Sequence, residues 1–432
     1  MADRLARRDA RIGRRRRTRR AAVAIVAAVC GSSVGIAGAA SGGVPAGSSG
    51  ATTAPPPRTG GAAKALSTRG MWIWYVSQSN GGSLSAIIST ARRYGISTVM
   101  IKAGDGTSAW SQFSPGLVST LHANGLKVCA WQYVYGNHPI FEAEVGATAV
   151  RNGADCLLID AEAEYEGKYV AAQEYIKKLR QLVGSSYPVG LAGFPYVDYH
   201  PAFPYSVFLG PGGAQNNTPQ MYWVDIGVST DTVYLHTYDY NLPYGRPIEP
   251  LGETSGNPST SQIVRFRQLS RAYGAPGLSW WDWQETSSRD WAALAQPIGN
   301  LSGFKASPTM PRLSTHSRGG LSSGDLVVWA QEHLVSAGAR ISIDGSFGSQ
   351  TQTAVTRFQI SHGLNPTGVI DQGTWEALLR YPPANVTWTS KGAHASRASA
   401  SGPLRLAPPG SARLRARRYE IPPHLGAGAG PR

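Results

Sequence analysis

Residues 155–164 read DCLLIDAEAE, an apolar run that ends in alternating acidic residues. A short apolar run of this kind is typical of a buried strand. The segment at 171–184, AAQEYIKKLRQLVG, places apolar residues at helical spacing and ends in glycine, a common helix stop. A buried strand followed by an amphipathic helix is the unit of parallel sheets covered by helices, so this stretch predicts an α/β fold.

The same alternation of strand and helix recurs along residues 70–296. Segments at 83–95 and 261–274 also have helical spacing and a terminal glycine. Eight such units fit a (β/α)8 TIM-type barrel, which typically takes about 250 residues, and a doubly wound sheet is the second possibility. The expected strands are residues 71–77, 97–103, 126–134, 155–164, 188–194, 218–224, 246–252 and 277–283.

A small C-terminal all-α domain is predicted over residues 324–381. Apolar spacing indicates helices at 325–337, 350–362 and 371–380, separated by glycine-containing turns. This segment resembles the three-helix peptidoglycan-binding module of bacterial cell-wall hydrolases, and the resemblance implies adhesion to peptidoglycan. The alternative is a helical packing domain without ligand affinity. The residues that carry the resemblance are Val328, Gln331, Leu334, Gly338, Ile343–Gly348, Thr351, Ala354, Val355, Phe358, Gln359, Gly363, Leu364, Gly368, Val369, Thr374, Trp375 and Leu378.

The N-terminal residues 1–40 have the order of an export signal. Arginines fill residues 4–20, an apolar run follows at 21–30, and small residues come next. The pair Arg19-Arg20 is compatible with a twin-arginine signal. Because the apolar run is too short to span a bilayer, we expect no stable membrane span after signal removal and an extracellular or cell-wall location.

Two linkers and a tail complete the chain. Residues 41–69 and 297–323 are rich in glycine, serine and proline, and residues 382–432 are expected to be a basic disordered tail. The net charge of +15 is concentrated near the two ends of the chain, so the predicted domains are close to neutral. A nucleic-acid-binding domain carries its positive charge on the folded surface, so nucleic acid is not an expected partner. We expect a monomer.

Asp160 and Glu162 are the candidate catalytic pair. Alternate side chains of a strand share a face, and barrel enzymes place catalytic groups at the C-terminal ends of strands. Glycoside hydrolysis uses two carboxyl groups roughly 5–9.5 Å apart, one of which carries a proton. Repulsion and burial raise the pKa of one member of such a pair. The alternative is a solvated acidic turn, because Glu164 and Glu166 continue the run.

Five segments of residues 70–296 share a pattern with a known family: Gly70–Ser77, Ile101–Gly106, Gly125–Val128, Asp160–Glu162 and Trp280–Gln284. With these segments, residues 70–296 resemble the Chalaropsis-type lysozymes, glycoside hydrolase family 25. The resemblance implies a (β/α)8-like barrel that cleaves the MurNAc–GlcNAc link of peptidoglycan. It also implies that Glu162 is the general acid and that Asp160 orients or stabilises the acetamido group of the substrate.

The first strand departs from this family. The family has an Asp where this chain has Trp74. The barrel is then either inactive, dependent on another acid such as Asp105, Asp282 or Glu253, or directed at another glycan. Chitinase-type barrels also end their fourth strand in D-x-E, but their longer D-x-x-D-x-D-x-E run is absent here.

Aromatic residues are abundant, with 12 Trp and 19 Tyr. Flat apolar rings near strand ends can stack on sugars, although core packing is their more frequent role. The candidate substrate-binding residues are Asp105, Trp74, Tyr133, Tyr222, Trp283 and Asp282.

No cofactor or metal is expected. Residues 70–296 contain no phosphate-binding glycine loop, no H-E-x-x-H and no G-x-S-x-G, so zinc and serine hydrolase chemistry lacks support in the predicted barrel. Cys129 and Cys156 lie in consecutive predicted strands, either as a disulfide or as two buried apolar residues. We therefore predict a secreted peptidoglycan glycosidase. The alternatives are a non-catalytic wall-binding protein with a degenerate barrel, or a hydrolase of another polysaccharide.

Overall fold

The computed structural model describes residues 66–299 and 301–396. The predicted export signal, most of the first linker and the last part of the predicted tail lie outside the described residues.

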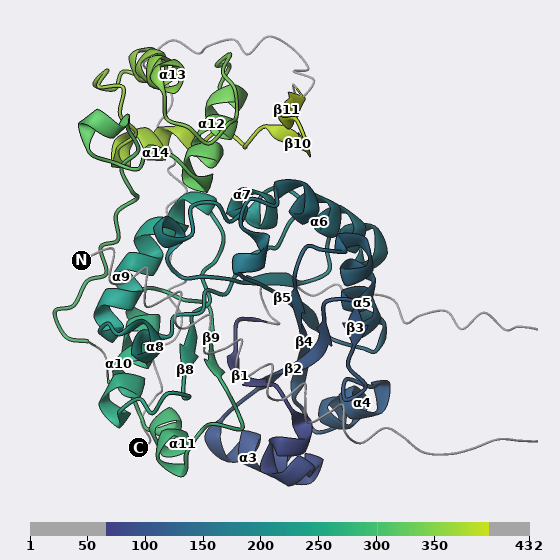
Figure 1. Ribbon diagram of the computed structural model, residues 1–432. Helices are drawn as coiled ribbons and strands as arrows, with labels where there is room; N and C mark the ends of the chain where they lie inside the picture. The colour runs from purple at the N-terminus through teal and green to yellow at the C-terminus, as the bar shows by residue number, and fades with distance from the viewer. Residues whose placement is uncertain (1–65, 300, 397–432) are drawn as a thin grey trace, which may run out of the picture.

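Eight parallel strands form a barrel surrounded by helices (Figure 1). The sheet order is β7-β6-β5-β4-β2-β1-β9-β8, and bridges between Asn217 and Ile248 and between Gln220 and Leu251 close the ring. The closed ring confirms the predicted TIM-type barrel and excludes the alternative, a doubly wound sheet. The strands are β1 (Arg69–Ile73), β2 (Thr98–Asp105), β4 (Lys127–Val134), β5 (Cys156–Ala161), β6 (Val189–Ala192), β7 (Asn216–Asn217), β8 (Leu251–Glu253) and β9 (Leu278–Trp281), and β3 (Ser108–Ala109) pairs antiparallel with β2.

The helices around the barrel begin and end at residues suited to those positions. Ser83 accepts a hydrogen bond from the Ala86 amide at the start of α3, which ends at Gly95 with φ 68°. Ser259 and Gln262 form a capping box at α10. The helices are α3 (Leu84–Tyr94), α4 (Pro115–Ala123), α5 (Pro139–Arg151), α6 (Tyr169–Val183), α7 (Tyr205–Leu209), α8 (Trp223–Ile226), α9 (Thr230–Asn241), α10 (Thr260–Ala272) and α11 (Ser288–Ala295).

The apolar core has two layers. One lies between the strands and the helices, and the other fills the inside of the barrel. Gly190 faces this interior, where an added Cβ would lie 2.8 Å from a Leu158 methyl carbon. The interior is thus a packed core and not a pore, as in other barrels of this size. Its buried members are Leu66, Trp72, Met100, Cys129, Trp131, Cys156, Leu158, Ala192, Tyr222 and Leu251.

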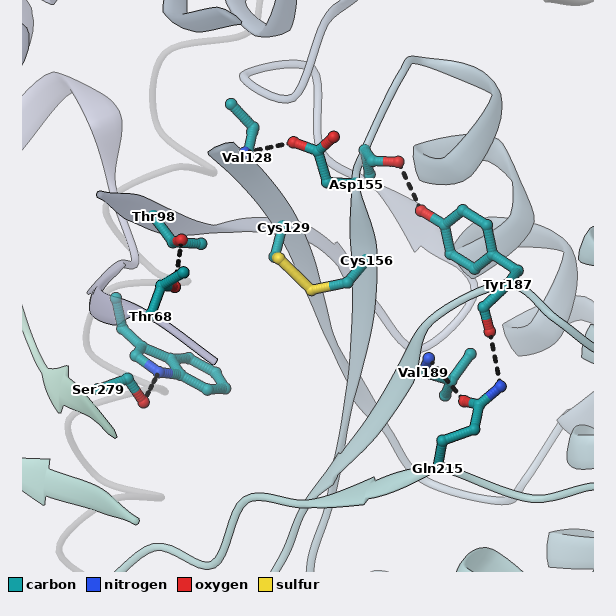
Figure 2. Close-up of a disulfide and its surroundings, with 12 residues drawn as sticks. Thr68, Thr98, Val128, Cys129, Asp155, Cys156, Tyr187, Val189, Gln215 and Ser279 are labelled. Atoms are coloured by element: carbon teal, nitrogen blue, oxygen red, sulfur yellow. Dashed lines mark hydrogen bonds between the residues drawn. A yellow bond between two sulfur atoms is a disulfide. The ribbon is translucent and has the colours of Figure 1, made fainter. Parts of the chain in front are cut away.

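Cys129 and Cys156 form a disulfide inside the barrel (Figure 2). The two residues are direct partners in the register of β4 and β5, with their Cα atoms 4.6 Å apart. Both are fully buried. Of the two interpretations that the sequence allows, the structure has the disulfide.

The three helices of the small domain are confirmed, as α12 (Asp325–Ser336), α13 (Ser349–Ser361) and α14 (Gln372–Leu378). Part of the predicted linker belongs to this domain, because Leu313 pairs with both Leu321 and Ile370.

A hairpin follows the small domain, formed by β10 (Asn385–Thr389) and β11 (Gly392–Ser396). We expected disorder from residue 382 onward, and for this stretch that prediction is wrong. The physical reason is an aromatic anchor, since the Trp388 ring packs 4.2 Å from the Tyr169 ring at the start of α6.

Candidate active site

The predicted catalytic pair lies at the C-terminal end of β5. Asp160 is 5% exposed, and Glu162, just after the strand, is half-buried. The side-chain amide of Gln220 donates to Asp160 Oδ1 at 3.0 Å and to Glu162 Oε1 at 3.2 Å. The two acids therefore point the same way and meet at one donor. Their catalytic roles remain predictions.

Gln220 was not a predicted site residue. It follows β7, and its backbone amide donates to the Gly193 carbonyl at 3.0 Å, which fixes it against the end of β6. A hydrogen bond donated to a carboxylate favours the ionised form, so this amide offsets part of the repulsion between the two acids. The available signal was its position two residues before Tyr222 in an expected strand, which places both side chains on one face.

A third carboxylate joins the pair. Tyr133, 1% exposed and in register with Asp160, donates its hydroxyl to Glu164 Oε2 at 2.6 Å. Glu164 is therefore directed at the strand ends. Glu166 points elsewhere and pairs with His200 at 2.7 Å. The interpretation as a solvated turn fails for Glu164 because a buried tyrosine holds it. We call the surface formed by Asp105, Tyr133, Asp160, Glu162, Glu164 and Gln220 the barrel mouth.

Asp105 occupies the mouth at the end of β2. Lys102 lies 2.6 Å from Asp105 Oδ2, and the Tyr135 hydroxyl donates to Asp105 Oδ1 at 2.7 Å. Lys102 is 1% exposed, so this ion pair is mostly enclosed by protein. The lysine ammonium also lies 4.5 to 5.2 Å from the ring centroids of Trp74, Trp110 and Trp131, a cation–π arrangement.

Trp74 lies just after β1. Its ring is half-buried, 5.8 Å from the Trp281 ring and stacked 5.5 Å from the Tyr75 ring. Tyr222 is 5% exposed and belongs to the same interior cluster. The mouth thus has an aromatic floor.

Three residues that the sequence offers as substrate-binding or alternative acidic groups, Trp283, Glu253 and Asp282, are buried in the protein. Trp283 is 3% exposed, packs against Trp291 in the outer core, and donates its indole N–H to Asn80. It has no free ring face, so its assignment to sugar stacking is wrong. Glu253 is fully buried and accepts a hydrogen bond from the Val224 amide.

Asp282 is 1% exposed and lies just after β9. Its Oδ1 accepts from the Glu285 amide at 3.1 Å, and its Oδ2 has no hydrogen-bond partner among the described residues. Burial, with a smaller contribution from Glu285, raises the pKa of Asp282 to about 7. With so little exposure, this carboxyl group is enclosed by the protein and is not presented to a substrate.

Comparisons with known proteins identify one domain. The family profile of a peptidoglycan binding domain matches residues 323–378, so the predicted module is present. A comparison with curated proteins finds no match. A peptidoglycan-binding protein from Clostridioides difficile is 44% identical over 14% of this chain and 37% of its own length, with a TM-score of 0.14.

Two further structures resemble the barrel at low identity. The spore cortex-lytic enzyme SleL from Bacillus cereus is 11% identical over 54% of this chain and 75% of its own, with a TM-score of 0.41. A chitinase from Chromobacterium violaceum is 11% identical over 53% of this chain and 99% of its own, with a TM-score of 0.37. Neither similarity is close enough to assign an activity.

Proposed function

We propose that this protein is a cell-wall glycosidase whose barrel cleaves peptidoglycan glycan strands while the small domain binds the wall. The observation that carries the proposal is the pair Asp160 and Glu162, held by one Gln220 amide at the C-terminal end of a parallel barrel. The peptidoglycan-binding domain on the same chain supports peptidoglycan as the polymer on which the barrel acts. The resemblance to Chalaropsis-type lysozymes favours a muramidase.

In this mechanism Glu162 is the general acid. It gives its proton to the glycosidic oxygen as the bond from the anomeric carbon to that oxygen breaks. Asp160, more buried than Glu162, orients or stabilises the acetamido group as positive charge develops on the sugar. Water then supplies the hydroxyl group of the new reducing end, and its proton returns to Glu162. Of the aromatic floor, the half-buried Trp74 ring is the part that can contact a sugar, whereas Tyr222 is packed in the barrel interior.

We also propose that the protein acts outside the cytoplasm. The Arg-rich and apolar N-terminal order supports export, although it lies outside the described residues. The Cys129–Cys156 disulfide supports it independently, because disulfides persist in oxidising compartments. Within residues 66–299 and 301–396, no helix combines the length and apolar character that a membrane span requires.

A second candidate is a wall-binding protein without catalysis. Trp74 replaces the family's acid, and its ring is one of three that surround the Lys102 ammonium. A mouth with an indole at the position of the family's acid is what a degenerate barrel would show.

The experiment that separates these candidates is lysis of purified walls by wild type and by Glu162→Gln. The amide keeps the shape of the acid but cannot donate the proton, and general acid catalysis contributes about 10²–10⁴-fold. We expect Glu162→Gln to lose lysis by a factor in this range while wall binding is unchanged. Lysis by neither protein would favour the non-catalytic candidate, and equal lysis by both would move the acid to another residue.

A further inference from the structure

Asp325, the first residue of α12, joins the small domain to the barrel. It is fully buried, and both of its carboxylate oxygens accept hydrogen bonds from barrel residues. Oδ1 accepts from the Tyr169 hydroxyl at 2.9 Å and the Ser206 hydroxyl at 2.7 Å. Oδ2 accepts from the Ser206 amide and the Tyr244 hydroxyl, both at 2.8 Å. A fully satisfied buried polar network of this kind specifies one arrangement of the groups that form it.

Because Asp325 is buried, its carboxyl group depends on the hydrogen bonds that the barrel donates. Burial raises the pKa of Asp325 to about 6, and the hydrogen bonds from Ser206, Tyr244 and Tyr169 act to lower it. A carboxylate taken out of water is tolerated only where such donors replace the lost solvent. In the observed position of the small domain, both oxygens of Asp325 are satisfied.

Other contacts reinforce the same position. Trp329 of α12 is 4% exposed and donates its indole N–H to the Pro243 carbonyl at 2.7 Å. Its ring lies 5.5 Å from the Tyr244 ring. The Asp325 amide donates to the Pro201 carbonyl at 2.8 Å. One face of α12 is therefore fitted to the segments around α7 and the end of α9.

The connecting segments add contacts on both sides. In the predicted linker, the Thr309 amide donates to Asp239 of α9, and Arg265 of α10 lies over the Phe304 ring at 5.4 Å. In the C-terminal hairpin, the Trp388 amide donates to Gln173 of α6 at 2.9 Å. The chain between and after the domains thus packs on the barrel instead of spanning a gap.

The docked domain lies beside the mouth. The segment that carries Glu162 and Glu164 leads directly into α6, whose first residue, Tyr169, contacts both Asp325 and the hairpin. Figure 1 shows α12 and the hairpin above α6 and α7, outside the ring of strands. The small domain is therefore attached next to the helix that follows the acidic segment.

We propose that the peptidoglycan-binding domain is a fixed part of the substrate-binding surface, so that one glycan strand contacts it and the barrel mouth together at a spacing set by Asp325. The proposal rests on the function proposed above for the barrel. A flexible tether would only raise the effective concentration of the barrel at the wall, whereas a fixed domain also sets the orientation before binding.

The first test is calorimetric unfolding of the full chain. We expect one cooperative transition for wild type and two separate transitions for Asp325→Ala, because the variant loses the interdomain acceptor. Trp329→Phe, which keeps an aromatic ring but removes the indole donor, should weaken the coupling in the same direction. The matched control is Asp371→Ala, which removes the side chain that caps α14 by accepting a hydrogen bond from the Thr374 amide within the small domain. It should lower the unfolding temperature and keep one transition.

The second test measures binding of soluble glycan strands of increasing length, prepared from peptidoglycan, to Glu162→Gln protein by titration calorimetry. We expect an affinity increase of about tenfold once a strand is long enough to reach both domains. This step should become smaller and less sharply dependent on strand length in the Glu162→Gln, Asp325→Ala double variant, because a flexible tether raises the effective concentration without fixing the spacing; an unchanged step would contradict the fixed spacing.

Two results would overturn the proposal, independent unfolding of the domains in wild type or an affinity that does not depend on strand length. A length-dependent step in a protein that hydrolyses nothing would support the fixed surface and reject only the proposed glycosidase. Hydrolysis without a length-dependent step would support the proposed glycosidase and reject the fixed surface.

Discussion

The position of one glutamine amide determines how the acids of the mouth interact. Gln220 donates to Asp160 and to Glu162 at hydrogen-bonding distance, and both contacts favour ionised carboxylates. A general acid must hold its proton at the working pH, so in the proposed mechanism the amide lowers the pH up to which Glu162 could act. We therefore assign Gln220 a positioning role, because its side-chain amide donates to both acids.

Replacing Gln220 by Met should move the alkaline limb of the pH–activity profile upward. The ionised form of Glu162 loses a donor, so its pKa rises and the acid stays protonated to higher pH. A hydrogen bond to a charged group is worth about 1.5–3 kcal/mol, which corresponds to a shift of about one pH unit or more. Profiles of kcat/KM for wild type, Gln220→Met and the exposed control Gln78→Met provide the measurement. An unmoved limb in Gln220→Met would exclude this role.

Asp282 makes stability depend on pH. Its folded pKa of about 7 lies above the ordinary value of 3.8, so the folded state binds the proton more tightly than the unfolded chain. The contribution is fully present below about pH 4 and is lost as the pH rises through 7, by about 4 kcal/mol in total. In denaturant unfolding between pH 5 and 8, Asp282→Asn should therefore depend less on pH than wild type. Parallel curves would show that Asp282 does not titrate in this range.

For single residues, strand periodicity predicts that the Asp160 and Glu162 side chains share a face, and the structure confirms this, because both accept a hydrogen bond from Gln220. Periodicity does not reveal Gln220 as the donor, because that amide comes from another strand and meets the acids only when the barrel closes. It also does not decide the side to which a residue just beyond a strand turns. For this reason Trp283 was wrongly assigned to the substrate surface.

Among the elements, β4 and β5 are covalently joined by Cys129–Cys156 across 27 residues of sequence. Closing a loop of this length lowers the entropy of the unfolded chain and stabilises the fold by about 3.5 kcal/mol. Protein refolded with reductant should therefore melt about 10 °C below oxidised protein, since 1 kcal/mol shifts a domain of this size by about 2–4 °C. The comparison changes only the cross-link. Equal melting temperatures would mean that strand packing alone supports this part of the barrel.

The alternation of strands and helices predicts the barrel, and all but one of the expected strands overlap an observed strand. The exception is 218–224: β7 (Asn216–Asn217) precedes it, and Gln220 makes one bridge to Leu251 before α8 begins at Trp223. The expected strand 246–252 overlaps β8 (Leu251–Glu253) only at its end, with one further bridge at Ile248. Prolines at 219, 247 and 250 explain this, because proline has no N–H to donate to a neighbouring strand. Proline and glycine content likewise suggests a loose linker at 297–323, but composition does not reveal the contacts by which a segment packs.

In the whole molecule, the barrel that carries the mouth and the peptidoglycan-binding domain pack directly against each other. The barrel supplies paired carboxyl groups, the small domain supplies attachment, and Asp325 fixes one against the other. The near-neutral charge of the folded part suits a surface that recognises sugars by rings and hydrogen bonds rather than by net charge.

The most direct test of the glycosidase proposal is reducing-end analysis of purified peptidoglycan after digestion with the protein. Borohydride reduction of the fragments distinguishes a new N-acetylmuramic acid terminus from a new N-acetylglucosamine terminus. We predict new N-acetylmuramic acid ends with wild type and a loss of about 10²–10⁴-fold in their rate of appearance with Glu162→Gln. Digests that contain no new reducing ends, from protein that remains bound to the wall, would contradict the proposed glycosidase.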